Sequence, residues 1–566
     1  MYRLPSSDLY HQSALYHLRK YSRPLQNNNS CYILNRGEIR VNTTPAFWLA
    51  CFLGVITLTE SARILVVSTI PSYSHLIPFQ SLWTALSQRG HKVVVLTTNP
   101  VGDLNLTNLT EIDLRSQYGI FTTDYTKLRF ISTWLDMEQN IMWDIFTDLT
   151  KNILEHQEVR KLYAPNSGEQ FDVVFIEIHV APAIYALAHR FNAPVIGIWS
   201  LPLPSDAYYN LGVPVLPSHP STWEMEYRTG FNLSLWQRMK NFIRLWHFLY
   251  YLFNQFVPQQ QALVEKYLGK VPDINEMMKN ISIIFCSQRE ITSFSRPQSL
   301  KVIQTGNLHI MKEPPPLSNN LEKFLNDTPN GFIYVSLGTN VKVMSLPNDV
   351  QRVFYNVLTS LPYKIVWKFD GHLPDKYDNI YIAKWFPQRS ILAHPNIKLF
   401  IYQGGLQSTE EAIHYGVPLL GIPILADQCT NINKMTFLGV AKSLDITTFS
   451  EKELNSSIMD IITDKRYKER MLDIKALSND EPYNRLENAI WWTEFVIRHK
   501  GAPHLHTNIA HEPWYKRYDM DVIAILSIVM FVVLICTSVI IYKLLKIIIL
   551  KYFWIKISVD IKKKIT

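Results

Sequence analysis

The feature that most constrains the fold is an alternation of short apolar runs with longer amphipathic segments. Residues 63–70 (RILVVSTI) and 91–98 (HKVVVLTT) have the composition of buried strands, and the segment between them has helical periodicity and stops at Gly90. The alternation returns with FDVVFIEI (171–178) and the residues that follow it. Continuous apolar strands separated by helices predict a parallel sheet covered by helices on both faces.

A second alternating series follows a break in composition. Residues 310–320 (IMKEPPPLSNN) contain three consecutive prolines and predict a stiff, exposed connector. The strand-like runs beyond it are GFIYVSLGT (331–339), YKIVWKF (363–369), IYIAKWF (380–386), IKLFIYQ (397–403) and VPLLGIPI (417–424). The sequence therefore predicts two doubly wound Rossmann-type α/β domains, 63–309 and 321–518, with a ligand cleft between them at the carboxyl ends of the strands.

The net charge of +8 is concentrated at the two ends of the chain. Residues 1–45 sum to +4 and residues 543–566 to +6, which leaves −2 for everything between them. A nucleic-acid-binding protein needs a basic face within a folded domain, so this distribution argues against nucleic acid as a partner.

The basic ends flank two apolar runs. Val522 to Ile541 has 20 residues without a charge, which is long enough to cross a bilayer as a helix, and the lysines after it predict a cytosolic tail at 543–566. The run 46–58 has the length of the apolar region of a signal sequence, so we expect residues 1–62 to be an extension and a signal sequence. Whether the first 45 residues are a genuine extension stays open.

Two further signals agree with a lumenal body and one membrane anchor. Beyond the apolar run 46–58, six Asn-X-Ser/Thr sequons, which are usable only in the secretory pathway, occur at Asn105, Asn108, Asn232, Asn280, Asn326 and Asn455. The terminal Lys563-Lys564-Ile565-Thr566 resembles the dilysine signal that coat-type retrieval machinery binds; a merely basic tail is the alternative. We expect a single-pass type I protein of the endoplasmic-reticulum membrane, in contact with membrane lipid.

The segment 235–253 (LWQRMKNFIRLWHFLYYLF) lies in an aromatic, proline-rich region and combines apolar residues with three Lys or Arg and His247. This pattern indicates an amphipathic helix that lines an apolar pocket or lies against the membrane. An ordinary core helix is the alternative.

The stretch LFIYQGGLQSTEEA (399–412) is a strand that ends in Gly404-Gly405 and continues into a helix. Glycines let a ligand approach the backbone, and the free N–H groups of a helix start favour an anion such as phosphate. A turn required only by chain geometry is the alternative.

The longer stretch WFPQRSILAHPNIKLFIYQGGLQSTEEAIHYGVPLLGIPILADQCTN (385–431) resembles the signature of the UDP-glycosyltransferases in order and spacing over 47 residues. SLGT (336–339), the two-domain layout and the C-terminal anchor fit the insect and animal UDP-glucosyl- and UDP-glucuronosyltransferases. The resemblance extends from about Ala62 to the end of the chain. It implies a GT-B fold and transfer of a sugar from a UDP-sugar to a small lipophilic acceptor.

The resemblance also implies a nucleoside site. Trp385 would stack on the uracil ring, since an aromatic face grips a planar base. Gln388 would lie by the nucleoside, and Glu411 would accept hydrogen bonds from the ribose hydroxyls. A tryptophan that merely belongs to the core is the alternative for Trp385.

In the same pattern Thr339 and the backbone at Gln407 and Ser408 would hold the diphosphate, on the helix start after Gly404-Gly405. Many relatives carry His where this chain has Gln403. The Gln403 amide can make the same neutral donation but cannot become cationic.

Asp427 and Gln428 would contact the sugar hydroxyls. We see no basic residue near them in the sequence that demands a carboxylate-bearing sugar, and therefore expect UDP-glucose rather than UDP-glucuronate. Asp427 as a simple helix cap is the alternative.

Glycosyl transfer to a hydroxyl needs a base, because an alcohol is a poor nucleophile at neutral pH. His75, in PSYSH, stands where the family keeps its catalytic histidine, and Glu177 stands where the family has an aspartate that stabilises the imidazolium. Glutamate is one methylene longer, so a buried carboxylate of another purpose is the alternative. His179 has no assigned role.

No metal or cofactor is implied, because the only Asp-X-Asp is Asp519-Met520-Asp521 beside the apolar run. The leaving group would be stabilised by the helix start and by hydroxyl donors. One alternative for function is a non-catalytic, chaperone-like UDP-sugar-binding relative. The other is a sugar-nucleotide epimerase of the same two-domain fold, and the signal sequence and membrane anchor argue against the epimerase. The oligomeric state stays open, a homo-oligomer included.

Overall fold

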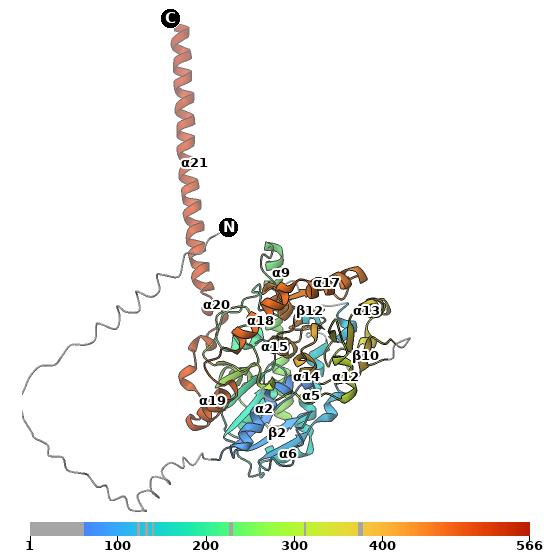
Figure 1. Ribbon diagram of the computed structural model, residues 1–566. Coiled ribbons are helices and arrows are strands. Elements are labelled where there is room, and N and C mark those ends of the chain that lie inside the picture. The colour runs from blue at the N-terminus through green and yellow to red at the C-terminus, as the bar shows by residue number, and fades with distance from the viewer. Residues whose placement is uncertain are drawn as a thin grey trace, which may run out of the picture. The chain divides into compact units, whose positions relative to one another are not determined.

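Two parallel sheets form the body of the protein (Figure 1). The computed structural model describes residues 61–121, 125–130, 134–137, 141–225, 230–310, 313–371 and 377–565. The predicted signal sequence and extension therefore lie outside the described residues. From Ser61 onward the chain forms one unit by its internal contacts.

The first sheet has seven strands in the order β3-β2-β1-β4-β5-β6-β7. Its strands are β1 (Arg63–Val67), β2 (Lys92–Thr97), β3 (Leu109–Asp113), β4 (Val173–Glu177), β5 (Val195–Trp199), β6 (Ile283–Cys286) and β7 (Val302–Gln304). Every pairing is parallel, with Leu65 of β1 opposite Val94 of β2 and Val174 of β4.

Helices cover both faces of this sheet, as the continuous apolar strands predict. They are α2 (Tyr73–Gln88), α3 (Tyr125–Leu128), α4 (Trp134–Met137), α5 (Trp143–Glu155), α6 (Gln157–Tyr163), α7 (Tyr185–Arg190), α8 (Ser205–Asn210), α9 (Leu235–Tyr251), α10 (Val257–Leu268) and α11 (Ile274–Lys279). Alternate residues of β1 enter different cores: Ile64 packs in the core that includes α2, and Leu65 in the core that includes α5.

The second sheet has six parallel strands in the order β10-β9-β8-β11-β12-β13. They are β8 (Phe332–Ser336), β9 (Lys364–Lys368), β10 (Ile380–Ala383), β11 (Ile397–Tyr402), β12 (Leu419–Gly421) and β13 (Ala441–Ser443). Its helices are α12 (Asn319–Asn326), α13 (Asn348–Ser360), α14 (Gln388–Ala393), α15 (Leu406–Tyr415), α16 (Gln428–Phe437), α17 (Glu451–Thr463) and α18 (Lys465–Asn479). The predicted pair of doubly wound α/β sheets is confirmed.

After α18 the chain returns to the first sheet. Helix α19 (Arg485–His499) packs against α2, and its Ala489 and Ile490 are buried in the same core as Ile64. No residue pattern in the sequence predicts this return, because the apolar pattern of a helix does not show which sheet it covers.

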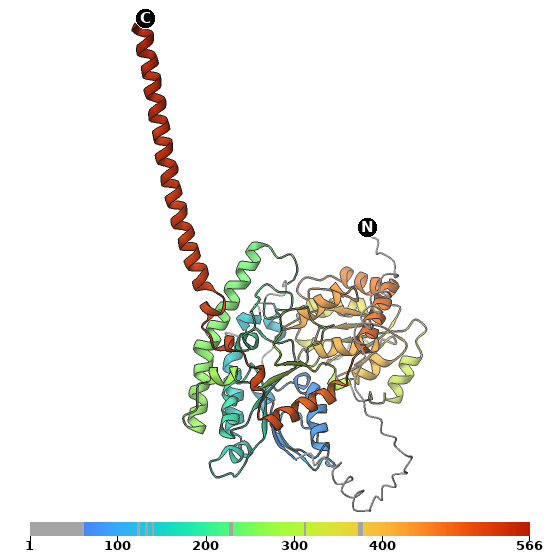
Figure 2. The same ribbon diagram turned by 90° about the vertical axis from the view of Figure 1, so that its left-hand side faces the viewer.

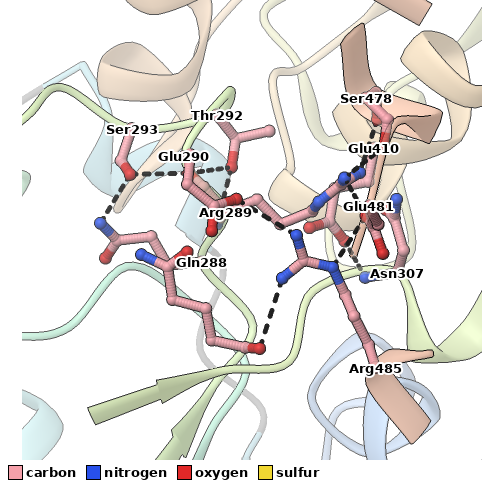
Figure 3. Close-up of polar contacts among 11 residues, drawn as sticks. Gln288, Arg289, Glu290, Thr292, Ser293, Asn307, Glu410, Ser478, Glu481 and Arg485 are labelled. Carbon is pink, nitrogen blue, oxygen red and sulfur yellow. Dashed lines mark hydrogen bonds and ion pairs between the residues drawn. The ribbon is translucent and has the colours of Figure 1, made fainter. Parts of the chain in front are cut away.

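A buried polar network fixes the return (Figure 3). The Arg289 guanidinium, from the segment after β6, donates to the hydroxyl and the carbonyl of Ser478 at 2.6 and 2.7 Å and also to Glu481. Arg485 donates to the same Glu481 carboxylate at 2.8 Å. On α15, the Glu410 carboxylate accepts the backbone N–H of Asn307 at 3.2 Å. The first crossing between the sheets is therefore bonded to the helix that follows the glycine pair, and the second crossing to the segment after β6.

Helix α9 has two different faces. Leu245, Phe248 and Leu249 are buried in the core of the first sheet, and the Phe248 ring lies 6.0 Å from that of Trp143 on α5. Apolar residues on another face are exposed. The expected amphipathic helix is therefore present, and the core interpretation holds for one of its faces.

The C-terminal part of the chain consists of α20 (Trp514–Arg517) and α21 (Met520–Ile565). Helix α21 contains the whole predicted span 522–541 and is long and apolar enough to cross a membrane, by length and composition. It continues through the predicted tail to Ile565, and none of its residues is buried.

Candidate active site

The carboxyl ends of the strands in the two sheets enclose a cavity of about 370 Å³. Of the predicted site residues, its lining includes His75, Thr339, Trp385, Gln388, Gln403, Gly405, Gln407, Ser408, Glu411, Asp427 and Gln428. Gly404 and Glu177 lie behind this wall rather than in it. Residues from both sheets thus converge on one cleft, as doubly wound folds place their ligand sites.

His75 lies in the first turn of α2, directly after β1, and contacts the end of β4. Its Nδ1 atom is 3.0 Å from Oε1 of Glu177. The other carboxylate oxygen of Glu177 accepts the backbone N–H groups of Thr69 at 2.7 Å and Ile70 at 2.9 Å. The hydroxyl of Ser68 donates to the same oxygen at 3.1 Å. The carboxylate is therefore held in place independently of the imidazole.

These contacts decide the ionisation of Glu177. Burial alone raises the pKa of a carboxyl group, but the hydrogen bond and charge of His75 and the two backbone N–H groups outweigh it. The pKa of Glu177 is consequently below its ordinary value, and the group is a buried carboxylate at neutral pH.

A second, apolar cavity of about 70 Å³ adjoins the first. Its lining includes Met142, Phe146, Trp199 and Trp223, and it shares His75 with the larger cavity. His75 thus lies at the boundary between a polar cavity and an apolar one.

His179 also lines the apolar cavity. It lies beyond the end of β4, so the alternation of side chains along a strand does not determine its direction. Strand β4 ends at Glu177, and His179 has a φ of 78°. Its Nδ1 atom lies 2.8 Å from Oδ1 of Asp206 on α8, and both side chains are buried. The cavity therefore borders two imidazoles, each paired with a carboxylate.

Trp385 is more than half exposed toward the larger cavity, so it is not a core tryptophan. Tyr73 packs against it in a T-shaped arrangement with ring centroids 5.6 Å apart, and the Lys368 ammonium lies 4.6 Å from the Trp385 ring centre. Lys368 also donates to the carbonyl of Gly338 at 2.7 Å, and burial lowers its pKa to about 8.

Gln388 and Glu411 form one hydrogen-bonded unit. The Gln388 amide donates to Glu411 at 2.7 Å and to the Ser408 hydroxyl at 2.9 Å, and it accepts from the Tyr334 hydroxyl at 3.3 Å. Burial raises the pKa of Glu411 to about 7, against the opposing effect of Gln388. Glu411 therefore changes charge close to neutral pH.

The two glycines after β11 have different roles. Gly404 has a φ of 99°, and a Cβ atom there would lie 2.6 Å from the carbonyl oxygen of Gln428. Gly405 is the N-cap of α15 with a φ of −59° and lines the cavity. Gln403 is buried, and its amide nitrogen lies against Gly338, which has a φ of 83°. Gly404 therefore serves packing, whereas Gly405 and Gln403 face the cavity.

Side chains of the second sheet reach across the cleft to the first. The Gln407 amide donates to the carbonyl of Ser200 at 2.7 Å, directly after β5. The Asn340 amide donates to the hydroxyl of Ser72 at 3.2 Å, at the start of α2. These bonds fix the position of His75 relative to the helix start of α15.

Asp427 is the N-cap residue of α16, but its side chain makes no capping hydrogen bond. It accepts from the Asn431 amide at 2.7 Å, and burial raises its pKa to about 6 while the nearby His75 opposes that shift. The amide oxygen of Gln428 accepts the backbone N–H groups of Ile424 and Leu425. The simple capping interpretation of Asp427 is therefore wrong.

Among the residues that the structure describes, no group of three or more His, Cys, Asp or Glu side chains could hold a metal ion. Asp427 and Glu411, the acidic side chains in the wall of the cavity, each bind an amide group instead.

Sequence reasoning missed several residues of the cleft. Lys368 is the last residue of β9, within the run YKIVWKF, and a charged residue at the carboxyl end of a strand is a signal that could have found it. Asn340 follows SLGT and could have been found in the same way. Tyr73, and Asp206, which is buried next to His179, carry no such signal, because neither ends a strand.

The chain matches a known family of enzymes along most of its length. The family model described as "UDP-glucoronosyl and UDP-glucosyl transferase" matches residues 62–552. The chain belongs to the UDP-glycosyltransferase family. It is therefore a glycosyltransferase that moves a sugar from a UDP-sugar to an acceptor, and the predicted resemblance is confirmed.

Relatives of this UDP-glycosyltransferase include enzymes named for both donors. UDP-glucosyltransferase 2 of Dactylopius coccus is 32% identical over 485 residues, which are 85% of this chain and 92% of the relative. The ecdysteroid UDP-glucosyltransferase of Spodoptera littoralis nuclear polyhedrosis virus is 32% identical over 85% of this chain and 97% of the relative. Human UDP-glucuronosyltransferase 2B15 is 29% identical over 80% of this chain and 88% of its own length.

Solved structures show the same fold at low identity. The glycosyltransferase of kitacinnamycin aligns with a TM-score of 0.50 and 18% identity, over 78% of this chain and all of that one. The protein thus has the predicted GT-B architecture, two Rossmann-like sheets with a cleft between them and a C-terminal apolar helix.

Proposed function

We propose that this UDP-glycosyltransferase transfers glucose from UDP-glucose, with inversion and without a metal ion, to a hydroxyl group of a small lipophilic acceptor. The observation that carries the proposal is the place of His75, which lines both the polar and the apolar cavity. A base at this boundary can touch an acceptor in one cavity and a sugar donor in the other.

His75 acts as the general base. Its Nδ1–H donates to Glu177, so Nε2 is the atom that takes the proton of the acceptor hydroxyl. The acceptor oxygen forms a bond to the anomeric carbon as the bond from that carbon to the diphosphate oxygen breaks. The proton stays on His75, and the Glu177 carboxylate stabilises the imidazolium, as in a catalytic triad.

The donor lies along the cleft from Trp385 to Asp427. Trp385 stacks on the uracil, and Glu411, oriented by Gln388, accepts from the ribose hydroxyls. The start of α15 then receives the diphosphate, because its free N–H groups and positive dipole end favour an anion.

Three further groups in the wall of the larger cavity are placed to donate to the phosphate oxygens. They are the Thr339 hydroxyl, the Gln403 amide and the Lys368 ammonium. Preorganised donors of this kind stabilise the charge that develops on the departing UDP.

Asp427 and the amide N–H groups of Gln428 hold the sugar hydroxyls. An acid and an amide pair well with hydroxyl groups, which supports glucose as the sugar. The two relatives named as UDP-glucosyltransferases, at 32% identity, support the same choice.

The acceptor occupies the apolar cavity next to His75. Aromatic and aliphatic side chains form most of its wall, which supports a small lipophilic molecule as its occupant.

We place the enzyme in the endoplasmic-reticulum membrane with α21 as a single type I span and both sheets in the lumen. The apolar length of α21 supports the span. The sequon asparagines support the lumenal placement, because Asn105, Asn232, Asn280, Asn326 and Asn455 are exposed to solvent. The dilysine at Lys563-Lys564 supports retrieval to this membrane.

The test is a turnover assay on membranes that contain the full chain, with UDP-glucose or UDP-glucuronate and a panel of phenols. We expect glucosides from UDP-glucose and at least tenfold less product from UDP-glucuronate. The reverse preference would contradict the donor assignment. UDP binding without turnover from any donor would instead support the non-catalytic relative.

A further inference from the structure

Helix α9 has an apolar face that is exposed to solvent and that no other described part of the chain covers. Leu235, Trp236, Met239, Phe242 and Ile243 are all exposed, with Trp236 at 64% and Ile243 at 63%. Their spacing of three and four residues places them on one side of the helix. Monomeric soluble proteins rarely expose so many large apolar side chains together.

This outer face of α9 is chemically suited to a bilayer surface. It contains Trp and Phe, the residue types that settle at the boundary between headgroups and acyl chains. The helix carries Arg238 and Lys240 beside the apolar face and no acidic residue along 235–251. The Lys240 ammonium lies 5.9 Å from the ring centre of Trp236. Long basic side chains beside an apolar face are typical of helices that lie in the membrane interface.

The same face of α9 extends to the N-terminal end of α21. Trp246, further along α9, meets Tyr518 edge-on with ring centroids 5.5 Å apart, and Tyr518 lies two residues before the start of α21 at Met520. The Tyr518 hydroxyl accepts the backbone N–H of Val215 at 3.3 Å. Figures 1 and 2 both show α9 beside the start of α21.

The neighbouring residue strengthens this attachment. Arg517 donates to the carbonyl of Tyr209 at 2.7 Å, and its guanidinium lies 4.1 Å from the centre of the Tyr209 ring. At 1.5 Å per residue, the apolar face runs about 16 Å from Trp246 to Leu235. A bilayer that contains α21 therefore begins next to one end of this face.

We propose that the outer face of α9, Leu235 to Ile243, is a second membrane contact, which inserts into the lumenal leaflet of the bilayer that α21 spans. The inference rests on the proposed membrane attachment through α21. Its occupant is phospholipid rather than a second copy of the chain, because the face adjoins the membrane helix and carries basic but no acidic side chains.

The test uses the full chain in vesicles of phosphatidylcholine with one-fifth phosphatidylserine and a trace of phosphatidylcholine that carries a diazirine near the headgroup. After illumination, lipid adducts are mapped by mass spectrometry of the peptides. We expect adducts on 231–243 at least about tenfold above those on the peptide that contains Leu300, an exposed leucine at 79%. Adducts at the start of α21 show that the chain is inserted.

The triple variant Trp236→Ser, Phe242→Ser, Ile243→Ser should reduce adducts on 231–243 at least about fivefold and leave α21 labelled as before. Its melting temperature and UDP affinity should not change, because these side chains are exposed. Leu300→Ser is the matched control and should change nothing.

Labelling of α21 without labelling of α9 above the Leu300 level would overturn the inference and leave the anchor intact. Protein cross-links between α9 helices of two copies, in place of lipid adducts, would also overturn it. Absence of adducts from α21 as well would overturn both the anchor and the inference.

Discussion

His75 and Glu177 face each other with Nδ1 and Oε1 3.0 Å apart, although Glu177 is one methylene longer than the aspartate that the family resemblance leads us to expect at this position. The extra length is accommodated because Thr69 and Ile70 hold the other carboxylate oxygen through their N–H groups. The contact expected between a histidine base and its carboxylate partner is therefore present with glutamate.

The variant Glu177→Gln should retain the fold but lower kcat roughly 100-fold or more, because a neutral amide cannot stabilise the imidazolium. UDP affinity should change less than about twofold, since Glu177 is outside the lining of the larger cavity. Steady-state kinetics with UDP titration by calorimetry checks both. A kcat close to that of the wild type would show that Glu177 has another purpose.

Glu411 should make nucleoside binding depend on pH. Its pKa is raised to about 7, mainly by burial. The ribose hydroxyls donate to the carboxylate form, so binding favours loss of the proton, and affinity should fall as the pH drops through 7. Well below the pKa of Glu411, the affinity should fall by about tenfold for each pH unit, the limit for the release of one proton.

Uridine is the suitable ligand for that measurement, because it has no phosphate to titrate between pH 6 and 8. Calorimetry should show the slope in the wild type and a flat profile in Glu411→Gln. The same slope in both proteins would assign the pH dependence to another group.

The adjacent glycines offer a matched pair. Gly404→Ala should cost about 2–4 kcal/mol of stability, because φ is positive and the new Cβ would meet the Gln428 carbonyl. Gly405→Ala has an ordinary φ and meets only the Gln403 amide, which can move, so it should cost less than about 1 kcal/mol. Melting temperatures measure the difference, and equal losses would contradict this division of roles.

Glu410 should weaken the protein as the pH rises. Burial raises its pKa to about 8, against the opposing charge of Arg289, whereas the unfolded chain has the ordinary value of about 4.3. Between these values the folded state holds a proton that the unfolded state has lost, so stability falls with increasing pH. Glu410→Gln has no carboxyl group at this position, so this fall in stability with pH should be absent from the variant.

The melting temperature of Glu410→Gln relative to the wild type should therefore be higher at pH 8 than at pH 5. Glu469→Gln, at an exposed position of α18, is the control and should show no such change. A difference that does not vary with pH would mean that Glu410 is ionised alike in both states.

The sequence predicts the fold well where one residue pattern has one structural meaning. The continuous apolar runs became parallel strands, and the residues after them, among them Thr339 and Gln403, line one cleft because parallel strands end at one edge. Contacts between distant segments were beyond prediction. The reach of Gln407 to Ser200 and the pairing of His179 with Asp206 depend on how elements far apart in sequence pack, which no local pattern encodes.

The most direct test of the account is the single-turnover rate of His75→Gln with UDP-glucose and a phenol acceptor, compared with the wild type at saturating substrate. Removal of the base should lower this rate roughly 100- to 10,000-fold and leave UDP affinity unchanged. The remaining rate should rise with the acidity of the phenol, because an acidic acceptor needs less help from a base. A rate within threefold of the wild type would contradict His75 as the base.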